Sequence, residues 1–251
     1  MNSKERFSDR VDTYVKYRPS YPAEAIDYLY GEVGLNAGST VADIGAGTGI
    51  FSRLLLERGS EVIAVEPNGE MRSAAVEALS EAPNFHAAAG SAEETTLAEH
   101  AVDFIVCAQS FHWFDRTAAQ AEFHRILKPG GKAALIWNSR LTQGTPFREG
   151  YDLLLKNYGT DYEKMTHKNI SSADLAAFFK PGNMREARFT MSQSFDFEGL
   201  KGRLLSSSYS PMPGHPNYEP LIAGLRELFD RTSVNGEIDF DYETEVYWGE
   251  V

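Results

Sequence analysis

An apolar run that ends on an acid and leads straight into alternating glycines constrains this chain most. The stretch is VADIGAGTGIFS, in which Asp43 is followed by Gly45, Gly47 and Gly49. The amphipathic run IFSRLLLERG begins at once, so the pattern predicts a strand, a tight turn and a helix. Because glycine lacks a Cβ atom and the first turn of a helix leaves N–H groups unpaired, a polar ligand can lie flat on this loop.

Several explanations of the loop compete. A P-loop needs Lys and then Ser or Thr at its end, and Ile50 and Phe51 stand there instead. A dinucleotide fingerprint fits Gly45 and Gly47 but requires glycine or alanine where Ile50 stands. An acid beside a pyrophosphate is unfavourable, whereas an acid beside a cationic ligand is favourable. A tight turn without a ligand is the remaining alternative.

A second acid follows the next predicted strand. Glu66 ends EVIAVE, about twenty residues beyond the glycine loop, where an acid commonly binds a ribose diol through two hydrogen bonds. Nicotinamide cofactors and S-adenosylmethionine both carry this diol. Glu66 alone therefore does not decide between them.

Strand-like and helix-like runs alternate from Val41 to Trp137, which predicts parallel βαβ units. Continuous apolar runs such as FIVCA suit strands buried on both faces. One helix is expected to open at the glycine loop, and another is expected to be capped by Asp115. The expected strands are 40–44, 61–66, 84–89, 102–109 and 132–138.

A length of 251 residues with 42% hydrophobic residues fits one compact α/β domain, either alone or with a small cap. We expect an N-terminal lid and first helix over 1–35, a cofactor-binding core over 36–138 and a cap of short helices and loops over 139–215. A last helix and an edge strand are expected over 216–251. The final run IDFDYETEVYWGEV alternates and is half polar, as edge strands often are.

Charge and composition exclude several classes of partner. The net charge of −12 argues against nucleic acid, because phosphate binding needs a basic face. No apolar run approaches the roughly 20 residues of a membrane helix, and the first residues lack the apolar core of a secretory signal. Cys107 is the one cysteine, and the histidines show no metal-ligand spacing. We expect a cytoplasmic monomer or homodimer that binds no metal, membrane or nucleic acid.

Five segments, in this order, resemble the class I S-adenosylmethionine-dependent methyltransferases. They are VADIGAGTGIFS, VIAVEPNGEM, GSAEETTL, VDFIVCAQSFHWFD and RILKPGGKAALIWN, within residues 36–138. The opening FSDRVDTYVKYRPSYP and the SFHWFD segment resemble the small-molecule subgroup with a methyltransferase type 11 domain that includes trans-aconitate methyltransferase-like proteins. The resemblance implies a Rossmann-like, doubly wound sheet of seven strands, mostly parallel with the last strand antiparallel, under a helical cap and an N-terminal lid.

The resemblance also implies a cofactor and a site for it. The cofactor is S-adenosylmethionine, and the reaction is methyl transfer to a small-molecule acceptor. Asp43 and the glycine loop would bracket the methionine part of the cofactor, and Glu66 would bind the ribose hydroxyls. The full set of implied cofactor contacts is Asp43, Gly45, Ala46, Gly47, Gly49, Glu66, Pro67, Met71, Ser91, Ala92, Glu93 and Gln109.

The N-terminal run adds two cofactor candidates. Pro19 and Pro22 make this stretch extended and stiff, as suits a lid. Tyr14 and Arg18 are expected to contact the cofactor carboxylate or an acidic substrate, since a guanidinium forms a bidentate fork to a carboxylate.

Residues that follow the fourth and fifth strands are expected to bind the acceptor. His112 is a candidate general base for a hydroxyl or amine acceptor, and Trp113 and Phe114 are expected to wall the pocket. Trp137, Arg140 and Tyr209 complete the expected substrate contacts.

The acceptor itself stays open. If Arg18 and Arg140 face the same pocket, they would suit a carboxylic acid or another O-nucleophile as the acceptor. A carboxylate is already a nucleophile and needs no general base. A nicotinamide-dependent oxidoreductase and a non-catalytic S-adenosylmethionine-binding protein remain the alternatives.

Overall fold

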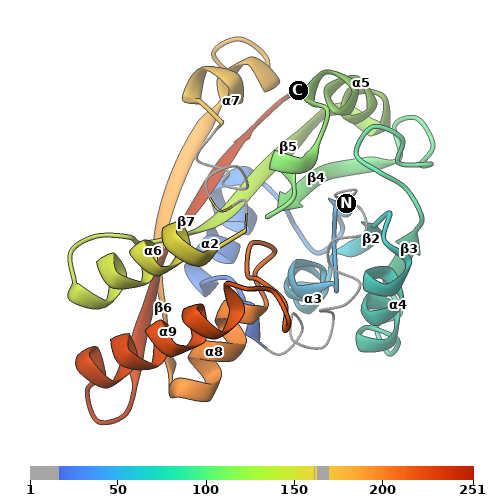
Figure 1. Cartoon of the computed structure of the whole chain (residues 1–251). Helices are drawn as coiled ribbons and strands as arrows, with labels where there is room; N and C mark the ends of the chain where they lie inside the picture. Colours follow the sequence, from blue (N-terminus) through green and yellow to red (C-terminus); the bar gives the residue numbers. More distant parts are fainter. Residues whose placement is uncertain (1–16, 161, 163–169) are drawn as a thin grey trace.

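The computed structural model describes residues 17–160, 162 and 170–251. In this part of the chain seven strands form one sheet in the order β3-β2-β1-β4-β5-β7-β6 (Figure 1). Strands β1 to β5 pair in parallel, and β7 runs antiparallel to both β5 and β6. The strands are β1 (Thr40–Ile44), β2 (Glu61–Val65), β3 (Phe85–Ala88), β4 (Val102–Ala108), β5 (Leu127–Arg140), β6 (Arg185–Phe195) and β7 (Ile238–Gly249).

This sheet confirms the predicted fold class, and each of the five expected strands has its counterpart from β1 to β5. Two predictions are wrong. The final strand β7 lies inside the sheet, between β5 and β6, and is not an edge strand. The segment 139–215 is not only helices and loops, because it contains the edge strand β6.

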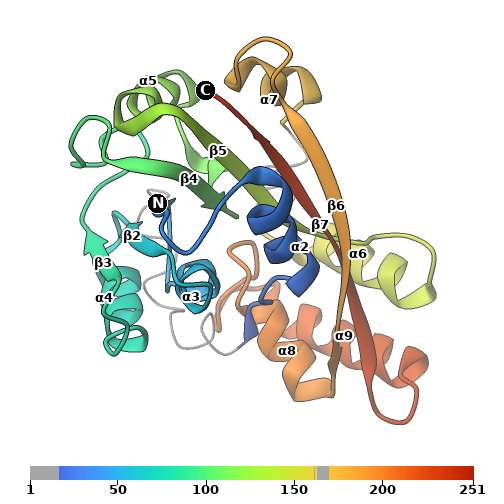
Figure 2. The same ribbon diagram turned by 180° about the vertical axis from the view of Figure 1, so that it is seen from behind.

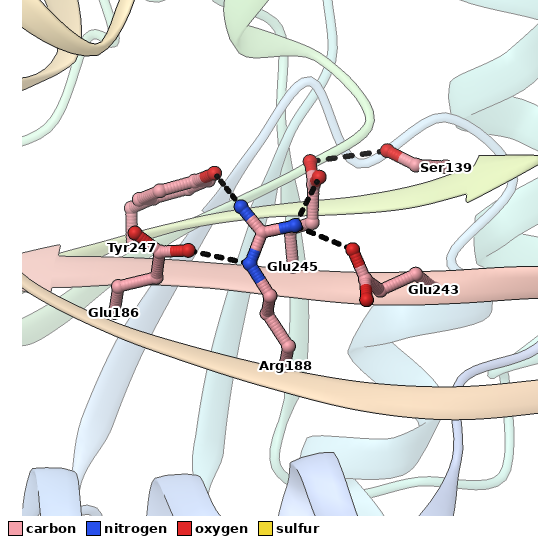
Figure 3. A network of polar contacts seen from close by, with 6 residues as sticks. All are labelled: Ser139, Glu186, Arg188, Glu243, Glu245 and Tyr247. Atoms are coloured by element: carbon pink, nitrogen blue, oxygen red, sulfur yellow. Dashed lines mark hydrogen bonds and ion pairs between the residues drawn. The ribbon is translucent and has the colours of Figure 1, made fainter.

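A polar network explains why β7 resembles an edge strand in sequence (Figure 3). Arg188 of β6 donates to carboxylates on the facing strand β7, and its Nη2 lies 3.2 Å from the Tyr247 hydroxyl. From β5, the Ser139 hydroxyl donates to Glu245 at 3.0 Å. Because partners on both neighbouring strands satisfy them, polar side chains are tolerated on a central strand. The network joins Ser139, Glu186, Arg188, Glu243, Glu245 and Tyr247.

Helices cover both faces of the sheet (Figures 1 and 2). Helices α5 and α7 contribute Phe123 and Phe178 to the core of one face. The first helices pack on the other face through residues such as Leu29 and Leu55. The elements are α2 (Ala23–Tyr28), the π-helical turn η3 (Leu29–Val33), α3 (Ile50–Glu57), α4 (Gly69–Ala78), α5 (Arg116–Ile126) and α7 (Ser172–Phe178).

Local chemistry sets the starts of these helices. Asp115 caps α5 as predicted, accepting from the N–H groups of Thr117 and Ala118 at 3.1 Å. Asn68 caps α4 by accepting from the Met71 N–H at 2.9 Å. Such caps satisfy N–H groups that the first helical turn leaves unpaired.

A second core lies under the cap. Helices α6 (Pro146–Tyr158), α8 (Phe197–Leu205) and α9 (Tyr218–Thr232) gather at one end of the molecule, beside β6 and β7 (Figure 1). Their apolar side chains pack on Phe240 and Tyr242 of β7. The cap therefore extends beyond the predicted 139–215, because α9 and the start of β7 complete its core. No helix in the described ranges is long and apolar enough to cross a membrane.

Candidate active site

A cavity of about 270 Å³ opens where the parallel strands end. Its floor is built by residues that follow β1, β2, β3 and β4, and its far wall by the end of β5, α8 and the residues after α8. Ligands of open α/β sheets bind at this edge of the sheet.

The glycine loop forms an acidic wall of the cavity. Asp43 at the end of β1 is fully buried, and its Oδ2 accepts from the Ser52 hydroxyl at 2.7 Å. Its other oxygen, Oδ1, is buried and has no hydrogen-bond partner among the described residues. Burial, with a smaller contribution from the nearby Glu66 carboxylate, raises the pKa of Asp43 to about 7, although hydrogen bonding from Ser52 acts in the opposite direction. A ligand that brings a positive N–H donor to Oδ1 would satisfy this carboxylate.

Glu66 connects the two loops that border this wall. One carboxylate oxygen accepts from the Gly47 N–H at 2.9 Å, and the other accepts from the Asn68 N–H at 2.8 Å. Glu66 is buried, and burial raises its pKa. Each oxygen keeps a lone pair for a hydroxyl donor. The side chain therefore holds the loops in place and can still bind a diol.

Gly45 cannot be replaced by a residue with a side chain. Its φ is +71°, and an added Cβ would lie 2.5 Å from the Ser110 Cβ. The Ser110 hydroxyl donates to the Ile44 carbonyl at 2.6 Å, which holds the end of β1 against the segment after β4. Gly49 is the N-cap of α3, and a Cβ atom added to it would meet Ala75 of α4 and Leu79 just after α4. Gly49 does not line the cavity.

The opposite wall carries buried guanidinium groups. Arg140, at the end of β5, donates from Nη2 to Asp152 at 2.9 Å and to the Tyr162 hydroxyl at 2.6 Å. Its Nη1 is buried and has no hydrogen-bond partner among the described residues. Arg203 of α8 is only 5% exposed; its Nε donates to the Tyr242 hydroxyl at 2.8 Å and its Nη1 to Ser207 at 3.0 Å.

Arg203 is thus a buried cation whose hydrogen-bond partners in the described ranges are neutral hydroxyls. Its guanidinium also lies over the rings of Phe240 and Tyr242. A buried charge without an opposite charge is costly unless a ligand compensates it. Since Arg203 lines the cavity, an anionic ligand can supply the missing charge.

The guanidinium groups of Arg203 and Arg140 also interact electrostatically with Tyr209. Burial would raise its pKa, but the guanidinium groups of Arg203 and Arg140 lower the pKa below its usual value. Its ring contacts the Tyr162 ring edge-on, with centroids 5.0 Å apart. Both tyrosines line the cavity beside the arginines.

The described part of the N-terminal segment crosses the cavity. Arg18 donates from Nη2 to the Ser206 carbonyl after α8 at 3.1 Å, and the Asn138 side-chain amide donates to the Ser20 carbonyl at 2.8 Å. Arg18 and Tyr21 line the cavity. The predicted contact of Tyr14 lies outside the described residues.

The SFHWFD segment lies where the sequence predicts it, with His112, Trp113 and Phe114 in the cavity lining. Trp137 does not line the cavity, which corrects the expectation that it contacts the acceptor. It is 2% exposed and lies behind His112, to whose Nδ1 its Nε1 donates at 3.4 Å.

Two other predicted cofactor contacts, Gln109 and Glu93, lie in well-defined positions beside the cavity. Gln109, at the end of β4, has a φ of +61°, which is uncommon for a side-chain-bearing residue and often marks a functional site. Glu93 accepts from the Asp115 N–H at 2.9 Å, so its carboxylate links the loop after β3 to the start of α5. Both residues line the cavity.

With the exception of Gly49 and Trp137, every predicted site residue that the structure describes lines this one cavity. Arg203 was not predicted. Its sequence signal is its place three residues after Leu200, on the buried face of an amphipathic helix. The other lining residues that were not predicted as contacts include Asn68, Asn138, Thr142, Tyr162 and Ser208.

Comparison with known families and proteins finds methyltransferases. A family described as a methyltransferase domain matches residues 42–135. An uncharacterized methyltransferase of Schizosaccharomyces pombe is 31% identical over 254 residues, which cover 97% of this chain and 96% of the relative. An uncharacterized methyltransferase of Mycobacterium tuberculosis is 43% identical over 134 residues, covering 53% of this chain and 52% of the relative.

Solved structures show the same fold. A provisionally assigned type II methyltransferase from Anaeromyxobacter dehalogenans has a TM-score of 0.71 at 22% identity, covering 93% of this chain and 98% of that chain. A SAM dependent methyltransferase from Aquifex aeolicus has a TM-score of 0.55 at 16% identity, covering 97% and 98% of the two chains.

Proposed function

We propose that this chain transfers a methyl group to a small carboxylic acid. The chain belongs to the class I S-adenosylmethionine-dependent methyltransferases. The enzyme uses S-adenosylmethionine as its cofactor. The observation that carries the choice of acceptor is the buried guanidinium of Arg203, which lines the cavity and whose hydrogen-bond partners among the described residues are hydroxyls.

The acidic wall suits the cofactor. When bound, S-adenosylmethionine supplies a methyl group activated by a positively charged sulfur. The buried Asp43 Oδ1, which has no partner among the described residues, would accept from the cofactor's amino group, and Glu66 would accept from the ribose hydroxyls. Gly45, Ala46 and Gly47 would bring the backbone close to the methionine part.

The remaining cofactor contacts are proposed along the same wall. Pro67 and Met71 would lie against the adenine, which suits their apolar surfaces. Ser91, Ala92 and Glu93 would border its edge, and Gln109 would approach the methionine part.

The basic wall suits an acid. Arg203 and Arg140 would bind a carboxylate, with Arg18 closing the site from the N-terminal segment. A carboxylate oxygen is already a nucleophile, so the protein's main task is to align it with the methyl group. Alignment of this kind is worth about 7–11 kcal/mol in favourable cases.

This proposal is tested by identifying the type of bond that links the transferred methyl group to the acceptor. The enzyme is incubated with isotope-labelled cofactor and a mixture of small mono- and dicarboxylic acids, and the labelled products are treated with mild alkali. Methyl esters release the label as methanol, and this is the expected result. A label that resists alkali, as in a methylated amine or carbon, would show that the acceptor atom is not a carboxylate oxygen.

A further inference from the structure

Trp137 is held rigidly behind the cavity wall. Its ring meets the rings of Phe111 and Tyr247 edge-on, with centroids 6.1 Å and 6.0 Å away. An indole N–H is a donor only, and a buried one needs an acceptor. The Trp137 Nε1 donates to Nδ1 of His112, at 3.4 Å.

This contact decides which nitrogen of His112 carries the proton. Since Trp137 can only donate, Nδ1 must offer its lone pair, and the proton of the neutral ring lies on Nε2. A second proton on Nδ1 would face the indole N–H inside the core. The ring lines the cavity, and Nε2 is the nitrogen on the side away from Trp137.

We propose that Trp137 is a positioning residue that holds His112 as the Nε2–H tautomer, so that His112 donates a hydrogen bond to the acceptor carboxylate and does not act as a general base. This inference rests on the proposed function for the identity of the acceptor, but the tautomer does not depend on it. It replaces the expectation that His112 removes a proton.

The chemistry balances without a base. A carboxylate oxygen supplies the electron pair of the new C–O bond, and the pair of the broken C–S bond stays on sulfur. The acceptor has no proton to lose, so His112 keeps its own. Its Nε2–H would fix the direction in which the carboxylate faces the methyl group.

The tautomer can be observed by long-range ¹H–¹⁵N NMR of the histidine rings. The spectra of the wild-type enzyme, Trp137→Phe and His112→Gln are compared, and His124→Gln on the exposed side of α5 serves as the control. The His112→Gln spectrum assigns the signal of His112. We expect an unprotonated Nδ1 and a protonated Nε2 in the wild type, and a mixture of tautomers in Trp137→Phe. A protonated Nδ1 in the wild type, or no change in a folded Trp137→Phe variant, would overturn the proposal.

Kinetic measurements on two variants of His112 distinguish a hydrogen-bond donor from a general base. The amide of His112→Gln can donate a hydrogen bond but cannot remove a proton, whereas His112→Phe can do neither. Because general-base catalysis is typically worth about 10²–10⁴-fold, we expect His112→Gln to keep the turnover number within about tenfold of wild type and His112→Phe to lose more. Equal loss in both variants would contradict the donor role. A wild-type enzyme that methylates no acid would instead reject the proposed acceptor and leave the NMR result standing.

Discussion

At the scale of single residues, Asp43 shows how the site is built at the expense of stability. Its carboxylate is fully buried, Ser52 satisfies one oxygen, and Oδ1 has no partner in the described ranges. A buried charge of this kind weakens the ligand-free protein and becomes favourable when a positive group binds. The residue that binding needs is thus one that folding alone would not select.

Replacing the Asp43 carboxylate should raise the free energy of unfolding at high pH while lowering the affinity for the cofactor. The pKa of Asp43 is raised from 3.8 to about 7, so the folded state holds more protons than the unfolded state between these values. Stability therefore falls as pH rises from about 4 to about 7. Asp43→Asn cannot ionise, and we predict a larger free energy of unfolding than wild type at pH 8 and a similar one at pH 4, by urea titration.

The same variant should bind the cofactor at least about tenfold more weakly in calorimetric titration, since a charge-assisted hydrogen bond is worth about 1.5–3 kcal/mol. Asp239→Asn, an exposed acid on β7, is the control and should change neither quantity. Full cofactor affinity in Asp43→Asn would contradict the assigned role.

At the scale of elements, β6 and β7 are joined by charge as well as by their backbone ladder. Arg188 of β6 contacts Glu186 on its own strand and Glu243 and Glu245 on β7 (Figure 3). One cation therefore offsets three carboxylates. The Arg188 side chain is 45% exposed, so water and salt screen this attraction.

Loss of this cation should destabilise the protein modestly and in a salt-dependent way. We predict that Arg188→Gln lowers the free energy of unfolding by about 1 kcal/mol at low ionic strength, the upper range for exposed pairs. The loss should shrink in 1 M salt. Arg185→Gln is the matched control on the same strand, because Arg185 contacts only backbone carbonyls among the described residues. Equal effects in the two variants would show that the charge network contributes nothing specific.

The same elements show what sequence can and cannot predict. The β1–α3 unit was predictable because its signals are local: an apolar strand, glycines that the turn requires, and an amphipathic helix. The strand β6 was missed because its alternating polar residues find their partners on β7, about fifty residues away in the chain. Arg203 was missed for a similar reason, since an arginine on a helix resembles a solvent-facing residue until the cavity beside it is known.

At the scale of the whole molecule, the charges of the cavity are divided. Asp43, Glu66 and Glu93 lie on the side built by β1 to β3, and Arg140 and Arg203 lie on the side built by β5 and the cap. The net charge of the chain is −12, so the basic wall is a local exception on an acidic protein. Division of this kind suits two ligands of different charge, held face to face between the sheet and the cap.

The most direct test of this account is the activity of Arg203→Met on a carboxylic acid acceptor, measured as kcat/KM beside the cofactor affinity of the same variant. Methionine fills similar space without charge, and Arg226→Met, at an arginine stacked on Phe197 away from the cavity, is the control. We predict a loss of at least about 30-fold for Arg203→Met, since truncating one partner of a buried charge pair costs about 2–5 kcal/mol. Cofactor affinity and stability should not fall. A folded Arg203→Met enzyme that methylates the acid as fast as wild type would contradict the account.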